Sequence, residues 1–163
     1  MPMPEFWLDS NCLIEPKQRY YPFDVVPAFW TFLEQKGREG IIASCALVYT
    51  ELERIEDELA EWAKRQQANG FFVEPDAGVQ SFMDDIQAYM VTRYEEHHIA
   101  EFMSGADPWL IAHARVHGGR IVTHEKGKPN AVQPKIPDVA DHFGLKPTLD
   151  IITLLRELGA SFK

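Results

Sequence analysis

The sequence predicts an α/β fold, a three-layer α/β/α sandwich with a central, mainly parallel sheet. Short apolar segments with the character of buried strands alternate with longer segments whose apolar residues recur every three or four positions, as on one face of a helix. The chain has 163 residues, 45% of them hydrophobic, and contains no internal repeat or low-complexity linker. This length and composition suit one core, so we expect residues 1–163 to form a single domain.

Short apolar runs mark the expected strands. Glu5–Asp9 is a run that stops at an aspartate, and Gly40–Ser44 is a second run of similar length. Phe71–Glu74 is expected to form a brief edge strand, and Arg120–Glu125 a strand that ends in an acid. The sequence allows a further short strand near Leu145–Lys146. Helices between these strands would make the sheet parallel.

Helical periodicity marks the segments between the strands. The longest, Cys45–Gln67, has apolar residues spaced 4, 3, 4 and 3 positions apart and is expected to stop at Asn69–Gly70. Helix Asp24–Gln35 is expected to end at Gly37 and Gly40. The other expected helices are Asp76–Tyr94, His98–Met103, Asp107–His117, Pro137–Phe143 and Thr148–Leu158.

Composition argues against several classes of function. The net charge of −9 argues against broad, nonspecific binding of nucleic acid. No apolar run approaches the roughly 20 residues of a membrane helix, and no basic residue precedes the first apolar stretch, so neither a membrane span nor a signal peptide is expected. Cys12 and Cys45 form no CxxC pair and match no disulfide framework, which favours a cytoplasmic location.

Four acidic residues are expected to meet at one edge of the sheet. Ligands of such sheets bind outside the carboxyl ends of the strands, and Asp9 and Glu125 end two predicted strands. Asp107 begins the helix that leads into the strand of Glu125, and that helix returns its N-terminus to the same edge. Glu51 interrupts the inward side of the long helix, about 9 Å along it. The sequence therefore predicts one acidic cluster.

Converging carboxylates repel one another unless cations or protons intervene. Their hard oxygen atoms suit Mg²⁺ or Mn²⁺, and two such ions about 3.5–4 Å apart can hold a phosphodiester and activate water. Ser10 and Thr123 are expected to orient these ligands or water. The loop at residues 126–135 carries Lys126, Lys128 and Lys135, which are expected to contact a phosphate backbone.

Each acid also has a structural interpretation that the sequence leaves open. Asp9 could cap the turn that follows it, and Asp107 could be the N-cap of its helix, with Pro108 at the first helical position. Glu51 and Glu125 could face solvent. The three basic side chains could likewise serve only to keep their loop soluble.

Histidines offer a rival metal site. His113 and His117 are four positions apart, as suits zinc on a helix, but no third ligand is evident. His97 and His98 are adjacent, so on a regular helix they would point about 100° apart and make a poor chelating pair.

The acidic motifs resemble those of PIN-domain proteins. FWLDSN resembles the opening strand of that family, YTELERI its helix glutamate at Glu51, ADPWLIAHA its third acidic motif at Asp107, and RIVTHE its strand ending in Thr-x-Asp. The resemblance implies a PIN-like fold and a Mg²⁺- or Mn²⁺-dependent ribonuclease, often a VapC-type toxin of a toxin–antitoxin pair and often a homodimer. RNA, an antitoxin protein and a second copy of the chain are therefore the implied partners.

The chain departs from that pattern in two places. Position 125 is Glu where the family usually has Asp, and the following segment KGKPNAVQPKIPD is extended, so Asp138 could replace or join Glu125 at a second metal. The length is closer to a longer bacterial PIN-like branch than to a minimal toxin.

Two other functions fit the same residues. A phosphatase of the aspartyl-phosphate type also uses Mg²⁺ and an Asp after its first strand, but it normally has a second acid two residues later, where this chain has Asn11. A non-catalytic PIN-like module that binds a partner is the third hypothesis.

Overall fold

A computed structural model describes residues 3–163 and confirms the α/β class. The four strands are β1 (Phe6–Leu8), β2 (Ile42–Cys45), β3 (Phe72–Val73) and β4 (Arg120–Val122). They form one sheet in the order β3-β2-β1-β4, and each pair is parallel. Trp7 of β1 is in register with Ala43 on one side and Ile121 on the other. The predicted edge position of β3 is thereby confirmed.

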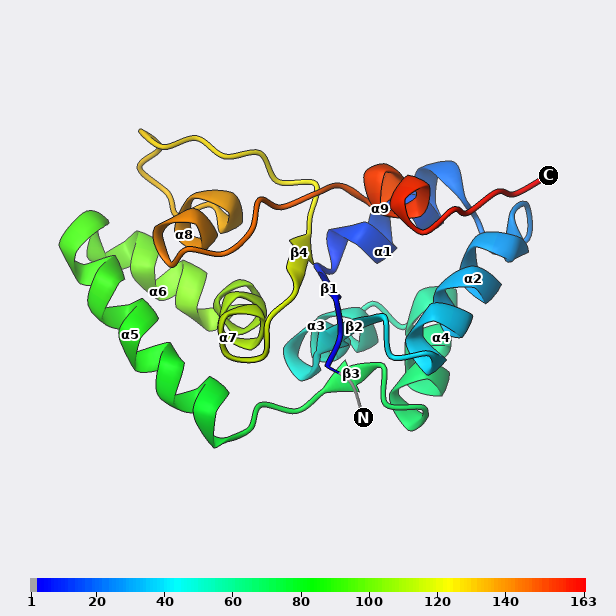
Figure 1. Cartoon of the computed structure of the whole chain (residues 1–163), viewed down its shortest axis with the longest axis horizontal. Helices are drawn as coiled ribbons and strands as arrows, with labels where there is room; N and C mark the ends of the chain where they lie inside the picture. The colour runs from blue at the N-terminus through cyan, green and yellow to red at the C-terminus, as the bar shows by residue number, and fades with distance from the viewer. Residues whose placement is uncertain (1–2) are drawn as a thin grey trace.

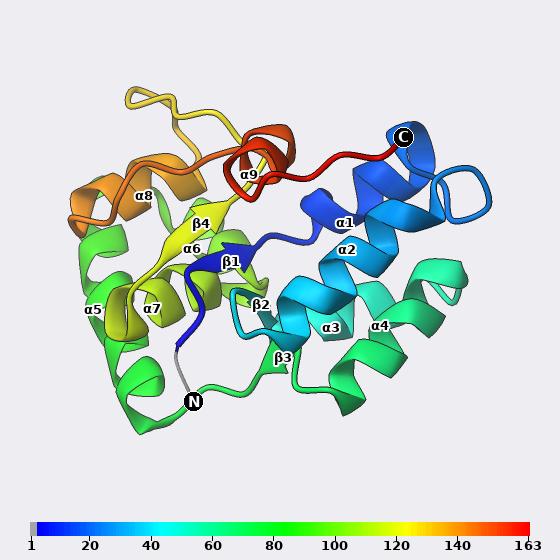
Figure 2. The same ribbon diagram turned by 45° about the vertical axis from the view of Figure 1, so that its right-hand side comes forward.

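Helices cover both faces of this sheet. They are α1 (Asn11–Glu15), the π-helical turn η1 (Pro16–Tyr20), α2 (Pro27–Arg38), α3 (Ala46–Glu53), α4 (Glu58–Ala68), α5 (Ala77–Arg93), α6 (Glu96–Ser104), α7 (Asp107–His117), α8 (Ile136–His142) and α9 (Ile151–Glu157). Helix α7 contacts β1, β2 and β4, and α5 packs against α7. Figures 1 and 2 show α5–α8 on one side of the sheet and α1, α2, α4 and α9 on the other. The arrangement is a three-layer α/β/α sandwich.

The helix expected at residues 45–67 is in fact two helices. Helix α3 ends at Glu53, and Glu56 has a φ of 52°, a left-handed conformation that a helix cannot continue through. Asp57 then caps α4, because its side chain accepts a hydrogen bond from the Ala60 amide. Ile55, one of the regularly spaced apolar residues of the expected helix, is 47% exposed in this connection. The regular spacing of apolar residues continues across this break, so the spacing alone did not predict the N-cap at Asp57.

Smaller differences concern the ends of elements. Gly37 lies inside α2 rather than after it, whereas Gly40 follows the helix with a φ of 76°. No strand forms near residues 145–146; instead Leu149 makes an isolated parallel bridge to Val122. Helix α1 and turn η1 were not expected, and β4 ends before Glu125. Sequence periodicity does not predict where these elements begin and end, because tertiary contacts also determine those positions.

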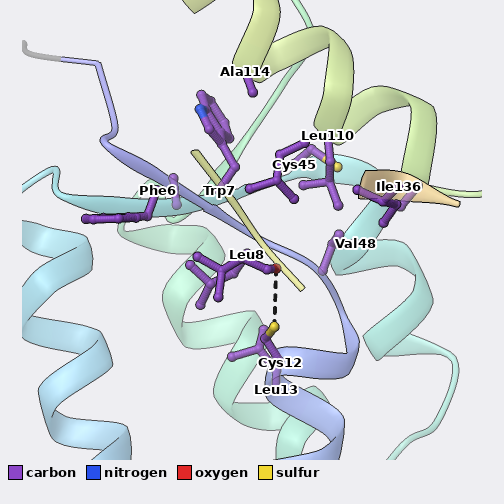
Figure 3. Packing of buried hydrophobic residues seen from close by; sticks show 14 of the residues in the cluster. Phe6, Trp7, Leu8, Cys12, Leu13, Cys45, Val48, Leu110, Ala114 and Ile136 are labelled. Carbon is purple, nitrogen blue, oxygen red and sulfur yellow. Dashed lines mark hydrogen bonds between the residues drawn. The ribbon is translucent and has the colours of Figure 1, made fainter. Parts of the chain in front are cut away.

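The core surrounds β1, one of the two inner strands of the sheet. Trp7 and Leu8 are fully buried, which requires helices on both faces of the sheet. Figure 3 shows Leu8 and Leu13 among the packed side chains, with the Cys12 thiol pointing toward the strands. That thiol donates a hydrogen bond to the Val122 carbonyl at 3.2 Å.

Both cysteines belong to this core. Burial raises the pKa of the Cys12 thiol well above its ordinary value, and it raises the pKa of Cys45 to about 12. Both thiols are therefore protonated at neutral pH and are poor nucleophiles. Among the described residues no helix is long and apolar enough to cross a membrane.

Candidate active site

The site lies where the strand order changes direction. Successive strands run outward from β1 through β2 to β3, and β4 then returns to the other side of β1, which opens a crevice beyond the carboxyl ends of β1 and β4. Asp9 follows β1 and Thr123 follows β4. The Asp9 amide donates to the Val122 carbonyl at 2.9 Å, so the two strand ends are held side by side.

Asp9 is 3% exposed, and hydrogen bonds fix its carboxylate. Its Oδ2 accepts from the Thr123 hydroxyl at 2.9 Å, and its Oδ1 accepts from the Ser10 amide at 2.8 Å. The Ser10 bond is local and resembles the turn-capping role that the sequence left open. The Thr123 bond joins residues 114 positions apart, so Asp9 also ties the two strand ends together.

Glu51 links the loop after β1 to the start of α7. Its Oε2 accepts from the Ser10 hydroxyl at 2.9 Å, and its Oε1 accepts from the Ala106 amide at 3.1 Å. Ala106 is the N-cap residue of α7, so the Glu51 carboxylate satisfies one of the free amides at that helix end. Glu51 is half-buried, so it is not simply a solvent-facing glutamate.

Asp107 is the first residue of α7 rather than its cap. The N-cap is Ala106, whose own side chain makes no capping hydrogen bond, so the interpretation of Asp107 as an N-cap is wrong. Asp107 instead lines a cavity of about 290 Å³ together with Glu51 and Glu125. The capping role has passed to Glu51, which leaves the Asp107 carboxylate available to the cavity.

Glu125 reaches the same cavity from the loop after β4. Its amide donates to the Thr123 hydroxyl oxygen at 3.1 Å, and its Oε1 accepts from the Ile136 amide at the start of α8 at 3.2 Å. Thr123 thus donates to Asp9 and accepts from Glu125, which fixes the orientation of its hydroxyl. Three of the four predicted acids, Glu51, Asp107 and Glu125, therefore line one cavity, and the buried Asp9 lies close enough for its charge to act on Asp107.

Several carboxylates lie close together at this cavity, and their negative charges repel one another. Burial and, after it, the charges of Asp9, Glu125 and Glu51 together raise the pKa of Asp107 to about 8, against the opposing effect of Lys135. Burial likewise raises the pKa of Asp9 to about 6, although the Thr123 hydrogen bond works against this rise. Protons are therefore bound near neutral pH unless another cation replaces them.

The carboxylates lie near one another, but no three of them bring their oxygen atoms close together. Among residues 3–163, no three of these acids bring ligand atoms within 4.8 Å of one another. Helix amides hold one oxygen each of Glu51 and Glu125, which keeps these two side chains at the rim. The donor set consists of oxygen atoms alone, which fits Mg²⁺ or Mn²⁺ better than Zn²⁺.

The remaining predicted residues divide between this cavity and the surface. Lys135 lines the cavity, whereas Lys126 and Lys128 are exposed on the loop and are not among its lining residues. Asp138 lines a separate cavity, and its Oδ2 accepts from the Lys128 amide at 2.8 Å. Asp138 therefore does not join Glu125, because its side chain anchors the extended loop that precedes α8. Figure 1 shows the course of that loop between β4 and α8.

The sequence did not predict two titratable residues of the cavity wall, His98 and Glu101. Both lie on α6, three positions apart, and therefore project from one side of that helix. That spacing is visible in the sequence, but the expected helix began only at His98 and gave no reason to place it against the acids.

The zinc site considered for His113 and His117 gains no third ligand among residues 3–163. His113 is fully buried against Trp7, with ring centroids 4.8 Å apart, and burial lowers its pKa to about 4. His117 Nε2 lies 2.7 Å from the Asp76 carboxylate. His113 is thus a core residue, and His117 contacts a carboxylate.

Comparison with known families gives a match over nearly the whole chain. Residues 6–162 match the model of a family described as a domain of unknown function (DUF4411). No curated protein matches the chain. The matched region contains the whole acidic cavity, and the description of the family assigns no activity to it.

Proposed function

The chain belongs to the DUF4411 family, and we propose that it is a PIN-like, metal-dependent ribonuclease that hydrolyses phosphodiester bonds at the acidic cavity. The observation that supports this most is the position of Glu51. It bonds to Ser10, next to Asp9, and to the Ala106 amide, next to Asp107. Hydrogen bonds thus join the segments of three acids that are distant in sequence at the carboxyl edge of the sheet.

Asp9, Glu51 and Asp107 would hold one Mg²⁺ or Mn²⁺, and Glu125 would contribute to a second. When bound, such ions neutralise phosphate charge, lower the pKa of water and stabilise the leaving oxygen. The raised pKa values of Asp9 and Asp107 support this assignment, because burial and then the neighbouring carboxylates make their charged forms costly without a bound cation.

The surrounding residues have distinct tasks in this proposal. The Thr123 hydroxyl holds Asp9 in a fixed orientation, and the Ser10 hydroxyl does the same for Glu51. Lys135 lines the cavity and would contact a non-bridging phosphate oxygen. The exposed Lys126 and Lys128 would contact the RNA backbone farther from the reacting bond.

The alternatives have weaker support. For an aspartyl-phosphate phosphatase, Asn11 stands where the second acid should be, and it is exposed at the start of α1. Both oxygens of Asp9 also accept hydrogen bonds, which makes its carboxylate a better fixed ligand than a free nucleophile. An intact set of acids likewise favours catalysis over a passive binding module. An antitoxin partner, a homodimer and a cytoplasmic location are further proposals that follow from the resemblance to PIN domains.

The test compares RNA cleavage by the unmodified chain, Asp9→Asn and Glu53→Gln in millimolar Mn²⁺ or Mg²⁺. Glu53 is an exposed acid on the same helix as Glu51, so its variant controls for charge alone. We expect Asp9→Asn to lower the cleavage rate by at least about 100-fold and Glu53→Gln to leave it unchanged. We also expect divalent cations to raise the melting temperature of the unmodified chain.

Equal cleavage by Asp9→Asn would contradict the proposal. So would the absence of both cleavage and thermal stabilisation in the unmodified chain. Turnover of a generic aryl phosphate without RNA cleavage would favour the phosphatase.

A further inference from the structure

A second group of metal-ligating side chains lies at the start of α6. One ligand atom from each of Glu95, His97 and His98 lies within 4.8 Å of the others, and the two imidazole ring centroids are 3.9 Å apart. The expectation that these neighbouring histidines diverge is therefore wrong. Glu95 is the N-cap residue with an extended backbone, and its Oε2 lies 3.7 Å from His97 Nδ1. The first turn of the helix thus brings the three side chains together.

An independent observation concerns the ring of His98. Its Nδ1 atom is buried and has no hydrogen-bond partner among the described residues. A buried ring nitrogen without a partner is costly, and such an atom calls for a bound water or ion. His97 and Glu95 are both mostly exposed, so an ion can reach the group from solvent.

We propose that Glu95, His97 and His98 form a second metal site that takes an imidazole-preferring transition-metal ion such as Zn²⁺. Two imidazole nitrogens and a carboxylate oxygen are a ligand set that zinc accepts, with a fourth position open to water. Mg²⁺ prefers an all-oxygen set, so the two sites select different ions. The Glu95 carboxylate also offsets the positive end of the helix dipole, which would otherwise disfavour a cation there.

One residue of the proposed zinc site lies in the wall of the acidic cavity. His98 lines that cavity and also a neighbouring one, whose wall includes Arg93, Tyr94 and Asn130. An ion on His98 therefore adds positive charge to the wall between two openings. The binding of this ion does not depend on the proposed nuclease activity, since none of its three ligands is an acid of the acidic cavity.

The experiment measures Zn²⁺ affinity by competition with a chromophoric chelator, and follows the histidine ring nitrogens by NMR. The full chain is compared with His97→Asn and with Glu96→Gln, an exposed neighbour outside the group. We expect one Zn²⁺ per chain, shifts in the His97 and His98 rings, at least about tenfold weaker binding for His97→Asn, and unchanged binding for Glu96→Gln. Millimolar Mg²⁺ should not displace the zinc.

An Asp9→Asn, Asp107→Asn double variant separates this site from the acidic cavity. The proposal expects this variant to bind Zn²⁺ as the unmodified chain does, whether or not the latter cleaves RNA. Loss of zinc binding in the double variant would place the ion in the acidic cavity and overturn the proposal. Equal affinity in His97→Asn, or no zinc binding by the unmodified chain, would overturn it as well.

Discussion

Replacing Asp107 by Asn should change how the stability of the protein depends on pH. The Asp107 carboxyl has a pKa of about 8 in the folded protein, raised by burial and by the charges of Asp9, Glu125 and Glu51 from the ordinary value of 3.8. Between these values the folded state holds a proton that the unfolded state has lost. This carboxyl therefore makes the fold less stable as the pH rises from about 4 to about 8.

The magnitude follows from the width of that interval. Each pH unit inside it lowers the free energy of unfolding by about 1.4 kcal/mol for one group. From pH 5 to pH 7 the unmodified chain should thus lose about 2.7 kcal/mol relative to Asp107→Asn, which has no proton to release. For a chain of this size the difference corresponds to roughly 5–10 °C in melting temperature.

Urea unfolding at pH 5, 6 and 7, followed by tryptophan fluorescence in the presence of a chelator, measures this difference. Titrating groups that do not interact with Asp107, such as His113, are present in both proteins, so their contributions cancel when the two are compared. Millimolar Mg²⁺ should reduce the pH-dependent loss in the unmodified chain and have less effect on the variant. A difference in stability that stays constant from pH 5 to pH 7 would refute the placement of Asp107 among buried carboxylates.

Three further predictions test other parts of the structure. Thr123→Val removes the donor to Asp9 and the acceptor for the Glu125 amide, and should lower the free energy of unfolding at pH 7 by about 1–3 kcal/mol in a urea titration. His113 has a pKa of about 4, below the ordinary 6.5, so the fold loses stability as the pH falls from 6.5 to 4; His113→Leu should remove this loss, about 1.4 kcal/mol per pH unit, and parallel acid-unfolding curves would contradict it. Lys135→Gln should weaken RNA binding and reduce its dependence on salt, as measured by fluorescence anisotropy at several salt concentrations, and an unchanged salt dependence would remove Lys135 from the proposed phosphate contacts.

Local features of the sequence were enough to predict the fold class. The apolar runs at β1, β2 and β4 and the periodic helices α5 and α7 stand out because burial between two helical layers requires such patterns. The same patterns predicted which acids follow strands, since the position of a residue at a strand end is a local property. Asp9 and Glu125 could therefore be named from their predicted strand ends, and Glu51 and Asp107 from their positions on predicted helices.

Tertiary structure alone decided what surrounds each acid. The role of Asp107 depended on whether a side chain distant in sequence could satisfy the free amides of α7, and Glu51 does so from a position 55 residues away from Ala106. Asp138 lies outside the acidic cavity because the extended loop folds back onto its side chain. His97 and His98 come together because of the conformation of the first turn of α6. These outcomes follow from through-space hydrogen bonds and burial, which the order of residues along the chain does not encode locally.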